Sequence, residues 1–309
     1  MTWHITADPT AFAENAGPFL RSSPVRHTIL LTVTSALLSQ GPHVYGESDP
    51  ILGWWTSTPS TPSMPSTPGR PFLSSAPGQV SGALLQTPPY PMTLTELPQE
   101  AVPAAAAALA VHLGLPSAPG AATPLTAVNL LVRDVAAFTE AWLAQAGGTA
   151  RPGRETRLFE LERLTPPDPL PPGMARLATP SDRPLLIDWF RGFHDSIGDS
   201  PENLDRIVDD RMAHGGVALW ELDGTPVSMA VYTRPESGMV RVQYVWTPPE
   251  HRRQGFGGAA TTAATRNALD AGATDVVLFT DLANPTSNAL YPRLGYRPIE
   301  DRAVVEFSR

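Results

Sequence analysis

A glycine-rich loop between a β-rich run and a helical pattern constrains the fold of this chain more than any other stretch. β-branched and aromatic residues from Val240 to Val245 predict a strand, which ends before Pro248-Pro249 because proline donates no ladder hydrogen bond. Small and apolar residues then recur at helical spacing from Phe256 to Ala268. Glycines let a ligand approach the backbone closely, and the N–H groups that begin a helix attract phosphate. The stretch therefore predicts a phosphate-binding turn in a fold that mixes helices with strands.

Two protein families use such a turn. The spacing Gly255-x-Gly257-x-x-Ala260 fits the dinucleotide fingerprint, with Asp281 as a candidate ribose-binding acid. The context opposes it, because the loop does not leave its strand directly and too little chain follows Asp281 to complete a doubly wound domain. Arg252-x-x-Gly255-x-Gly257 instead resembles the R/Q-x-x-G-x-G/A motif of the GNAT superfamily of acetyl-CoA-dependent acyltransferases. The resemblance implies acetyl-CoA as co-substrate.

A second motif lies near the end of the chain. Asn284 followed by proline is a good start for a helix, and Gly295 stands where a helix would end. Asn284, Asn288 and Tyr291 would share one face of that helix. The stretch resembles the GNAT pattern N-x-x-S-x-x-L-Y-x-x-x-G-F/Y, from which Pro292 departs. The alternative is a capped surface helix in which Tyr291 only packs.

The resemblance assigns roles to these residues. The end of the strand would pair with the pantetheine arm, the loop would hold the pyrophosphate, and Tyr291 would give a proton to the departing thiolate. Arg252 would pair with phosphate or remain solvated. No metal site is predicted. The predicted cofactor contacts are Val245, Trp246, Thr247, Arg252, Arg253, Gln254, Gly255, Phe256, Gly257, Gly258, Asn284 and Asn288.

The base that deprotonates the acceptor is not identified by the sequence. Five titratable residues are candidates, and each is equally compatible with an ordinary polar surface position: Glu221, Glu236, Glu250, His194 and Asp195. Trp189 and Phe193 lie four residues apart on a predicted helix, so they line an acceptor pocket or belong to the core.

The order of predicted elements occurs twice, as β-α-α-β-β-β-α-β-α-β, with closing strands over 156–164 and 303–307. We therefore predict an α/β (α+β) fold of two GNAT-like domains, each a mixed, mostly antiparallel sheet flanked by helices. Residues 1–165 form a degenerate copy without the glycine loop, and residues 173–309 form the catalytic domain. A proline-rich linker covers 166–172, and a Pro/Ser/Thr insert over 56–79 is predicted to be disordered.

Composition narrows the function further. The chain has no cysteine, which excludes disulfides and a covalent acyl-cysteine intermediate, and its formal net charge of −8 favours neither nucleic acid nor an anionic membrane as a partner. No signal peptide is evident at the N-terminus, and a cytoplasmic location is expected. The oligomeric state is not predicted.

These observations together predict an acetyl-CoA-dependent N-acetyltransferase that acts directly on an amine of a small molecule or peptide. The alternative is a non-catalytic acyl-CoA-binding sensor or interaction protein with the same fold. Transfer of a longer acyl chain, or to an oxygen nucleophile, is the third reading.

Overall fold

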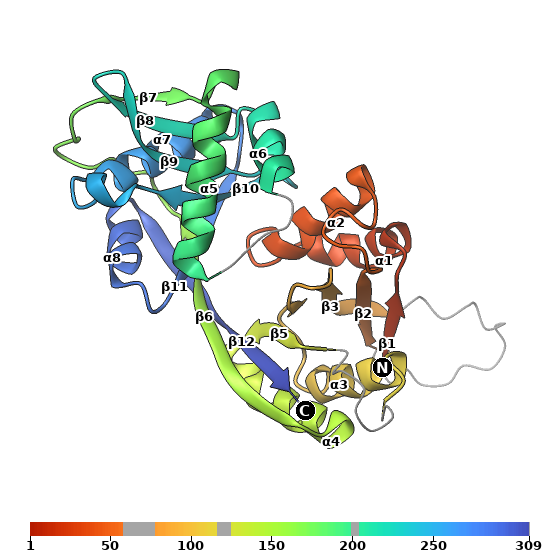
Figure 1. The fold of residues 1–309 in the computed structure, drawn as a ribbon. Coiled ribbons are helices and arrows are strands. Elements are labelled where there is room, and N and C mark those ends of the chain that lie inside the picture. Colours follow the sequence, from red (N-terminus) through yellow and green to blue (C-terminus); the bar gives the residue numbers. More distant parts are fainter. Residues whose placement is uncertain (58–77, 116–124, 199–203, 309) are drawn as a thin grey trace, which may run out of the picture. The chain divides into compact units, whose positions relative to one another are not determined.

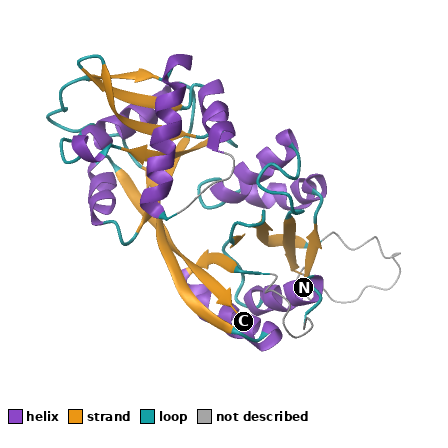
Figure 2. Ribbon diagram, in the orientation of Figure 1, coloured by secondary structure: helices purple, strands orange, loops and turns teal. Residues whose placement is uncertain are grey.

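The structure is a computed structural model that describes residues 1–57, 78–115, 125–198 and 204–308 (Figures 1 and 2). Most of the predicted insert, residues 58–77, lies outside these ranges. Within them the element order is the predicted one, twice over, which confirms the mixed α/β fold. No helix in the described ranges is long and apolar enough to cross a bilayer.

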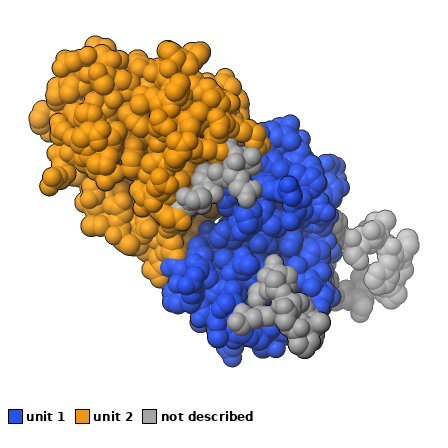
Figure 3. All heavy atoms as spheres, in the orientation of Figure 1, with its two compact units in different colours: residues 1–22, 33–153, 303–309 blue, residues 23–32, 154–302 orange. Residues whose placement is uncertain are grey.

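The chain divides into two compact units, shown in blue and orange in Figure 3. Unit 1 comprises residues 1–22, 33–153 and 303–309, and unit 2 comprises residues 23–32 and 154–302. Three elements contribute to both units: α2 (Thr28–Gln40), β6 (Thr149–Leu161) and β12 (Tyr296–Ser308).

Unit 1 is a mixed sheet with helices on it. Its strand order is β1-β2-β3-β4-β5 followed by β12, and only the β4–β5 pair is parallel among its first five strands. Helices α3 and α4 pack along each other. Besides the shared elements, it contains β1 (Thr2–Thr6), α1 (Pro9–Arg21), β2 (Ile51–Ser57), β3 (Gln79–Gln86), β4 (Met92–Leu94), α3 (Ala101–His112), β5 (Ala127–Leu131) and α4 (Val135–Ala146).

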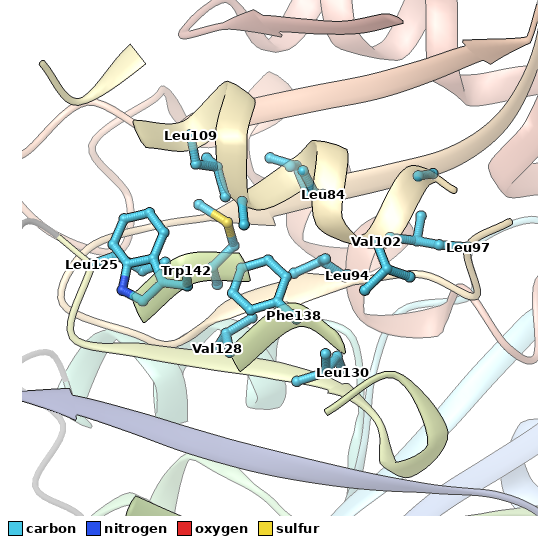
Figure 4. Close-up of a cluster of buried hydrophobic side chains, with 14 of the residues drawn as sticks. Leu84, Leu94, Leu97, Val102, Leu109, Leu125, Val128, Leu130, Phe138 and Trp142 are labelled. Atoms are coloured by element: carbon cyan, nitrogen blue, oxygen red, sulfur yellow. The ribbon is translucent and has the colours of Figure 1, made fainter. Parts of the chain in front are cut away.

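The core of unit 1 is filled by large apolar side chains (Figure 4). Phe138 and Trp142 of α4 are both fully buried, and they lie among leucines and valines of the sheet and of α3. Phe307 of β12 packs against both rings, with ring centroids 6.5 and 5.9 Å away. Side chains of these sizes leave the centre of the unit closely packed.

Unit 2 has the same plan. Its strand order is β7-β8-β9-β10-β11 followed by β6, and only the β10–β11 pair is parallel. Its own elements are β7 (Met174–Leu177), α5 (Arg183–Ile197), α6 (Leu204–Ala213), β8 (Val217–Leu222), β9 (Thr225–Tyr232), β10 (Met239–Trp246), α7 (Phe256–Asp270), β11 (Asp275–Asp281) and α8 (Pro285–Arg293).

The two faces of the unit 2 sheet carry separate cores. One lies under α7 and α8 and includes Phe256, Leu278 and Tyr291. The other lies under α5 and α6 and includes Phe190 and Val231. Because side chains alternate along a strand, each position of β10 and β11 belongs to one of these faces. This alternation decides which residues can meet a ligand from which side.

The compact units differ from the predicted division at 166–172. That proline-rich segment lies inside unit 2, where the Trp220 Nε1–H donates to the carbonyl of Pro172 at 2.9 Å. The reason is that β6 already pairs with β11 over Thr156–Glu160, so the chain has entered unit 2 before it reaches the prolines. The segment is thus a loop from β6 to β7 within one unit.

Candidate active site

The centre of unit 2 is the place where two parallel strands diverge. β10 and β11 pair from Met239–Asp275 to Val242–Leu278, and the ladder ends there. Along its other edge β11 pairs with β6, from Val277–Glu160 to Asp281–Thr156. On its other side β10 has a bulge between Gln243 and Trp246, in which Tyr244 takes a φ of 48°. The backbone of β10 beyond Val242 thus faces a gap that no strand fills.

A cleft of about 720 Å³ occupies this gap, a volume typical of small-molecule sites. Its walls come from six parts of unit 2: the end of β10 with the loop after it, the start of α7, the end of β11, α8 with the residues just before it, the end of α5, and β6. The residues in these walls include Arg154, Phe193, Tyr244, Val245, Trp246, Thr247, Arg252, Gly257, Asp281, Asn284 and Tyr291.

The glycine-rich loop opens α7 at the edge of the cleft. Gly255 has a φ of 86° and precedes the first helical residue, and the first helical hydrogen bond runs from the Ala259 N–H to the Gly255 carbonyl at 3.1 Å. Within the described ranges no backbone carbonyl accepts from the N–H groups of residues 253–258. A Cβ atom on Gly257 would lie 3.3 Å from Thr247 Oγ1, so the backbone is closely approached. These features form an anion-binding helix start.

Arg252 is held at the rim of the cleft. Its Nε donates to the Thr247 carbonyl at 3.0 Å, and its guanidinium lies 4.9 Å from the centroid of the Trp246 ring. A guanidinium over an indole face is attracted by the ring's electrons. The positive charge is therefore fixed beside the start of α7, where it adds to the attraction for an anion.

Helix α8 forms another part of the cleft wall. Asn284 caps it, because its Oδ1 accepts from the Ser287 N–H at 3.1 Å, and it also lines the cleft. Tyr291, in the last turn of the helix, is buried at 6% exposure between Phe159 and Tyr296, with ring centroids 6.2 and 6.0 Å away. Among the residues the structure describes, none accepts a hydrogen bond from its hydroxyl.

Burial raises the pKa of Tyr291 to about 12. Removing the phenolate from water disfavours the charged form, so the hydroxyl stays protonated throughout the physiological range. A protonated phenol that lines a cleft is a hydrogen-bond donor for a ligand there. The cleft therefore has an anion-binding helix start at one end and a fixed neutral donor at α8.

The family comparison agrees with this geometry. The family model described as "Acetyltransferase (GNAT) family" matches residues 183–296, which include the glycine-rich loop, both diverging strands and Tyr291. The chain contains a GNAT domain. None of the curated proteins matches the sequence.

Solved structures extend the likeness from the GNAT domain to the whole chain. A GCN5-related N-acetyltransferase from Sphaerobacter thermophilus covers 99% of this chain over 95% of its own length, with a TM-score of 0.62 and 14% identity. A GNAT-family acetyltransferase from Colwellia psychrerythraea covers 100% of both chains at a TM-score of 0.56 and 9% identity. A GCN5-related N-acetyltransferase from Kribbella flavida covers 73% of this chain and 86% of its own, with a TM-score of 0.51 and 21% identity. At these identities the likeness concerns the fold.

Half of the twelve predicted cofactor contacts lie in the walls of the cleft. Six of them line the cleft, namely Val245, Trp246, Thr247, Arg252, Gly257 and Asn284. Arg253, Gln254, Gly255, Phe256 and Gly258 belong to the loop and helix start but are not in its walls. Phe256 is instead part of the core under α7.

Asn288 is placed away from the cleft. Its Oδ1 accepts from Thr280 Oγ1 at 2.5 Å, and its Nδ2 donates to the carbonyls of Asp281, Leu282 and Asn284. These bonds tie α8 to the end of β11. The amide that the sequence assigned to the cofactor is thus occupied within the GNAT domain itself.

The five candidate bases do not line the cleft. Glu221 accepts from Arg176 Nε at 2.8 Å near the sheet edge, and His194 is buried with its ring 5.4 Å from that of Tyr244. The carboxylate in the cleft wall is Asp281, which the sequence suggested only for the rejected dinucleotide reading. Trp189 belongs to the core under α5, whereas Phe193 lines the cleft.

Arg154 was not among the predicted site residues. It lines the cleft from β6, in a block of sequence assigned to the other domain. No motif surrounds it, and only the pairing of β6 with β11 brings it to the site. A search of the sequence for local patterns could not find it.

Proposed function

We propose that the GNAT domain transfers an acetyl group from acetyl-CoA to a primary amine. The observation that carries the proposal is one cleft with two specialised ends, the glycine-rich start of α7 and the buried hydroxyl of Tyr291. A pyrophosphate requires the first and a departing thiolate requires the second. Acyl transfer from a CoA thioester would use both.

Acetyl-CoA, when bound, supplies an activated thioester. The N–H groups at the start of α7, with Gly257 at the edge of the cleft, would hold the pyrophosphate. The edge of β10 after Val242, beyond the end of its ladder with β11, would pair with the amides of the pantetheine arm. Its N–H groups also offer donors for the negative charge that develops on the acyl oxygen.

Tyr291 would act at the sulfur. Its hydroxyl is neutral and has no acceptor among the described residues, so it is available to a developing thiolate. A hydrogen bond to a charged acceptor is stronger than one to a neutral acceptor. The bond therefore forms mainly as the thiolate departs, which is the condition for a catalytic effect.

We propose that unit 1 does not bind a cofactor of its own. Phe138 and Trp142 fill its centre, and Glu100 precedes α3 without a side-chain capping bond. An acidic residue at that helix start repels phosphate. We propose that residues 1–153 are a degenerate copy of the same fold with a structural role.

The test is thiol release from acetyl-CoA across a panel of primary amines, small peptides and alcohols. The proposal expects acceptor-dependent release with at least one amine. Binding of acetyl-CoA without any acceptor-dependent release would support the sensor alternative. Faster thiol release from a longer acyl-CoA would show that the donor is not acetyl-CoA. Faster release with alcohols than with amines would show that the acceptor is an oxygen nucleophile.

A further inference from the structure

The side of the cleft that faces α5 carries two opposite charges, Arg154 of β6 and Asp281 of β11. Phe159 of β6 and Leu278 of β11 belong to the core under α7 and α8. Arg154 and Asp281 lie an odd number of positions from these residues, so alternation puts both on the opposite sheet face. Arg154 Nη2 indeed donates to the carbonyl of Ile197 at the end of α5.

The ion pair between these two residues is loose. Arg154 Nε lies 3.5 Å from Asp281 Oδ2, and the two side chains are 40% and 36% exposed. On the other face of β6, Arg157 makes two hydrogen bonds to Asp301, at 2.6 and 2.7 Å. A single long contact satisfies neither group, whereas a bidentate pair satisfies both. Arg154 and Asp281 thus keep capacity for a ligand.

Separate bonds hold each group in its place. Asp281 Oδ1 accepts from the Ala283 N–H at 2.7 Å, which leaves Oδ2 toward Arg154. The bond from Arg154 to the Ile197 carbonyl leaves its remaining guanidinium donors for other acceptors. Two fixed and incompletely paired charges of opposite sign form a dipole on the cleft wall.

Beside this dipole the same wall is aromatic. Phe193, Tyr244 and Trp246 all line the cleft, and the first two rings are in edge contact at 5.3 Å. Trp246 is packed so tightly against α5 that a Cβ on Gly192 would lie 2.9 Å from its ring. The wall is therefore rigid and apolar, and it favours a hydrophobic substituent.

We propose that the acceptor is a zwitterionic α-amino acid with an apolar side chain. This inference rests on the proposed acetyl transfer. The carboxylate of the acceptor binds Arg154, its ammonium lies against Asp281, and its side chain packs on the aromatic wall. A simple ammonium ion would be attracted by Asp281 but repelled by Arg154, because these two charges together are neutral. A zwitterion places a charge of opposite sign against each of the two residues.

The proton balance is complete in this arrangement. The ammonium gives one proton to Asp281 and from there to water, and the free amine then forms the bond to the acyl carbon. The C–S bond breaks with its electron pair on sulfur. The second proton of the nitrogen ends on that sulfur, so the products are the N-acetyl amino acid, the free thiol and one released proton.

The experiment compares kcat/KM for L-phenylalanine and for phenethylamine, which lacks only the carboxylate. The full-length protein should prefer L-phenylalanine by about 10- to 100-fold, as expected for charge-assisted hydrogen bonds. Arg154→Gln should remove that preference by lowering kcat/KM for L-phenylalanine alone, through KM. Asp281→Asn should lower kcat/KM for both amines. Arg157→Gln, on the same strand but the other face, is the matched control and should keep the preference.

Several results would overturn the inference. Equal use of the two amines by the wild type would do so, as would Arg154→Gln lowering both rates equally. Turnover of other amines but not of L-phenylalanine would overturn it while acetyl transfer stands. If acetyl-CoA binds and no amine is consumed, acetyl transfer itself fails. Calorimetric titration of L-phenylalanine into the CoA-saturated protein then decides the inference. If the wild type does not bind L-phenylalanine, the inference is refuted. If the wild type binds it and Arg154→Gln does not, the inference is supported.

Discussion

Replacing Tyr291 with phenylalanine tests the most specific chemical role in the account. The ring lies between Phe159 and Tyr296, and phenylalanine keeps those contacts while it removes only the hydroxyl. Because no described residue accepts from this hydroxyl, its loss breaks no internal hydrogen bond. The variant should therefore fold as the wild type does, and its effect should appear in the chemistry.

The size of the kinetic effect follows from the pKa. Burial raises the pKa of Tyr291 to about 12, whereas an ordinary thiol has a pKa of about 8.5. Full proton transfer to the thiolate is then uphill by about 5 kcal/mol, at roughly 1.4 kcal/mol per pKa unit. Tyr291 should act as a strong hydrogen-bond donor, worth about 10- to 100-fold in rate. We expect kcat to fall by that factor with the KM for acetyl-CoA little changed.

Alkaline unfolding gives a second readout of the same hydroxyl. Folding raises the pKa of Tyr291 from 10.0 to about 12. The contribution of its protonated hydroxyl to the free energy of unfolding is therefore fully present below pH 10 and is lost as the pH rises toward 12. The wild type should lose up to about 2.7 kcal/mol more free energy of unfolding over that window than Tyr291→Phe does. Denaturant melts at several pH values measure this. A variant that retains more than half of the wild-type kcat would refute the donor role.

Three further predictions concern the loop, the edge of the sheet and the domain boundary. Gly257→Asp should weaken acetyl-CoA binding by at least about 10-fold in calorimetry, because it adds a negative charge where the backbone meets phosphate and crowds Thr247; unchanged affinity in a folded variant would remove the phosphate assignment. Asp182 accepts from Arg176 and Thr179, and its pKa is lowered from 3.8 to about 2, first by the Arg176 hydrogen bond. The ionised Asp182 carboxylate stabilises the fold fully above pH 3.8, and this stabilisation is lost as the pH falls toward 2. In denaturant melts at pH 7, Asp182→Asn should therefore lower the free energy of unfolding by about 2 kcal/mol. A decrease below about 0.5 kcal/mol would contradict this. A fragment 173–309 should fail to fold, because β11 loses β6 as its partner over Thr156–Glu160; a soluble, cooperatively melting fragment would show that β6 is dispensable.

The local elements were predictable because each has its own pattern. The helical spacing from Phe256 to Ala268 corresponds to α7, and Asn284 caps α8 as its position before proline predicted. The glycines lie at the helix start because Gly255 takes a left-handed conformation that other residues rarely adopt. For the same reason the helix start at the edge of the cleft could be located from the sequence.

The sequence did not reveal which sheet each closing strand joins. β6 and β12 are each longer than predicted, 149–161 and 296–308, and each runs through both units. Alternation along a strand specifies its faces but not its partners, which tertiary packing decides. Arg154 reaches the cleft only through that pairing. This is why Arg154, unlike the glycine-rich loop, could not be predicted from the sequence as a residue of the cleft wall.

Asn288 shows a different limit. Its spacing from Asn284 and Tyr291 placed three polar side chains on one helix face and suggested one shared ligand. In the structure its amide bonds to nearby carbonyls and to Thr280 instead. Amide side chains often bond to neighbouring backbone groups, and periodicity alone does not separate that use from ligand binding.

The most direct test of the account is calorimetric titration of acetyl-CoA into the full-length protein. The cleft of unit 2 has the open helix start and the diverging strands, whereas Phe138 and Trp142 fill the centre of unit 1. We therefore expect binding with a stoichiometry of one acetyl-CoA per chain. Absence of binding, or two molecules bound per chain, would contradict it.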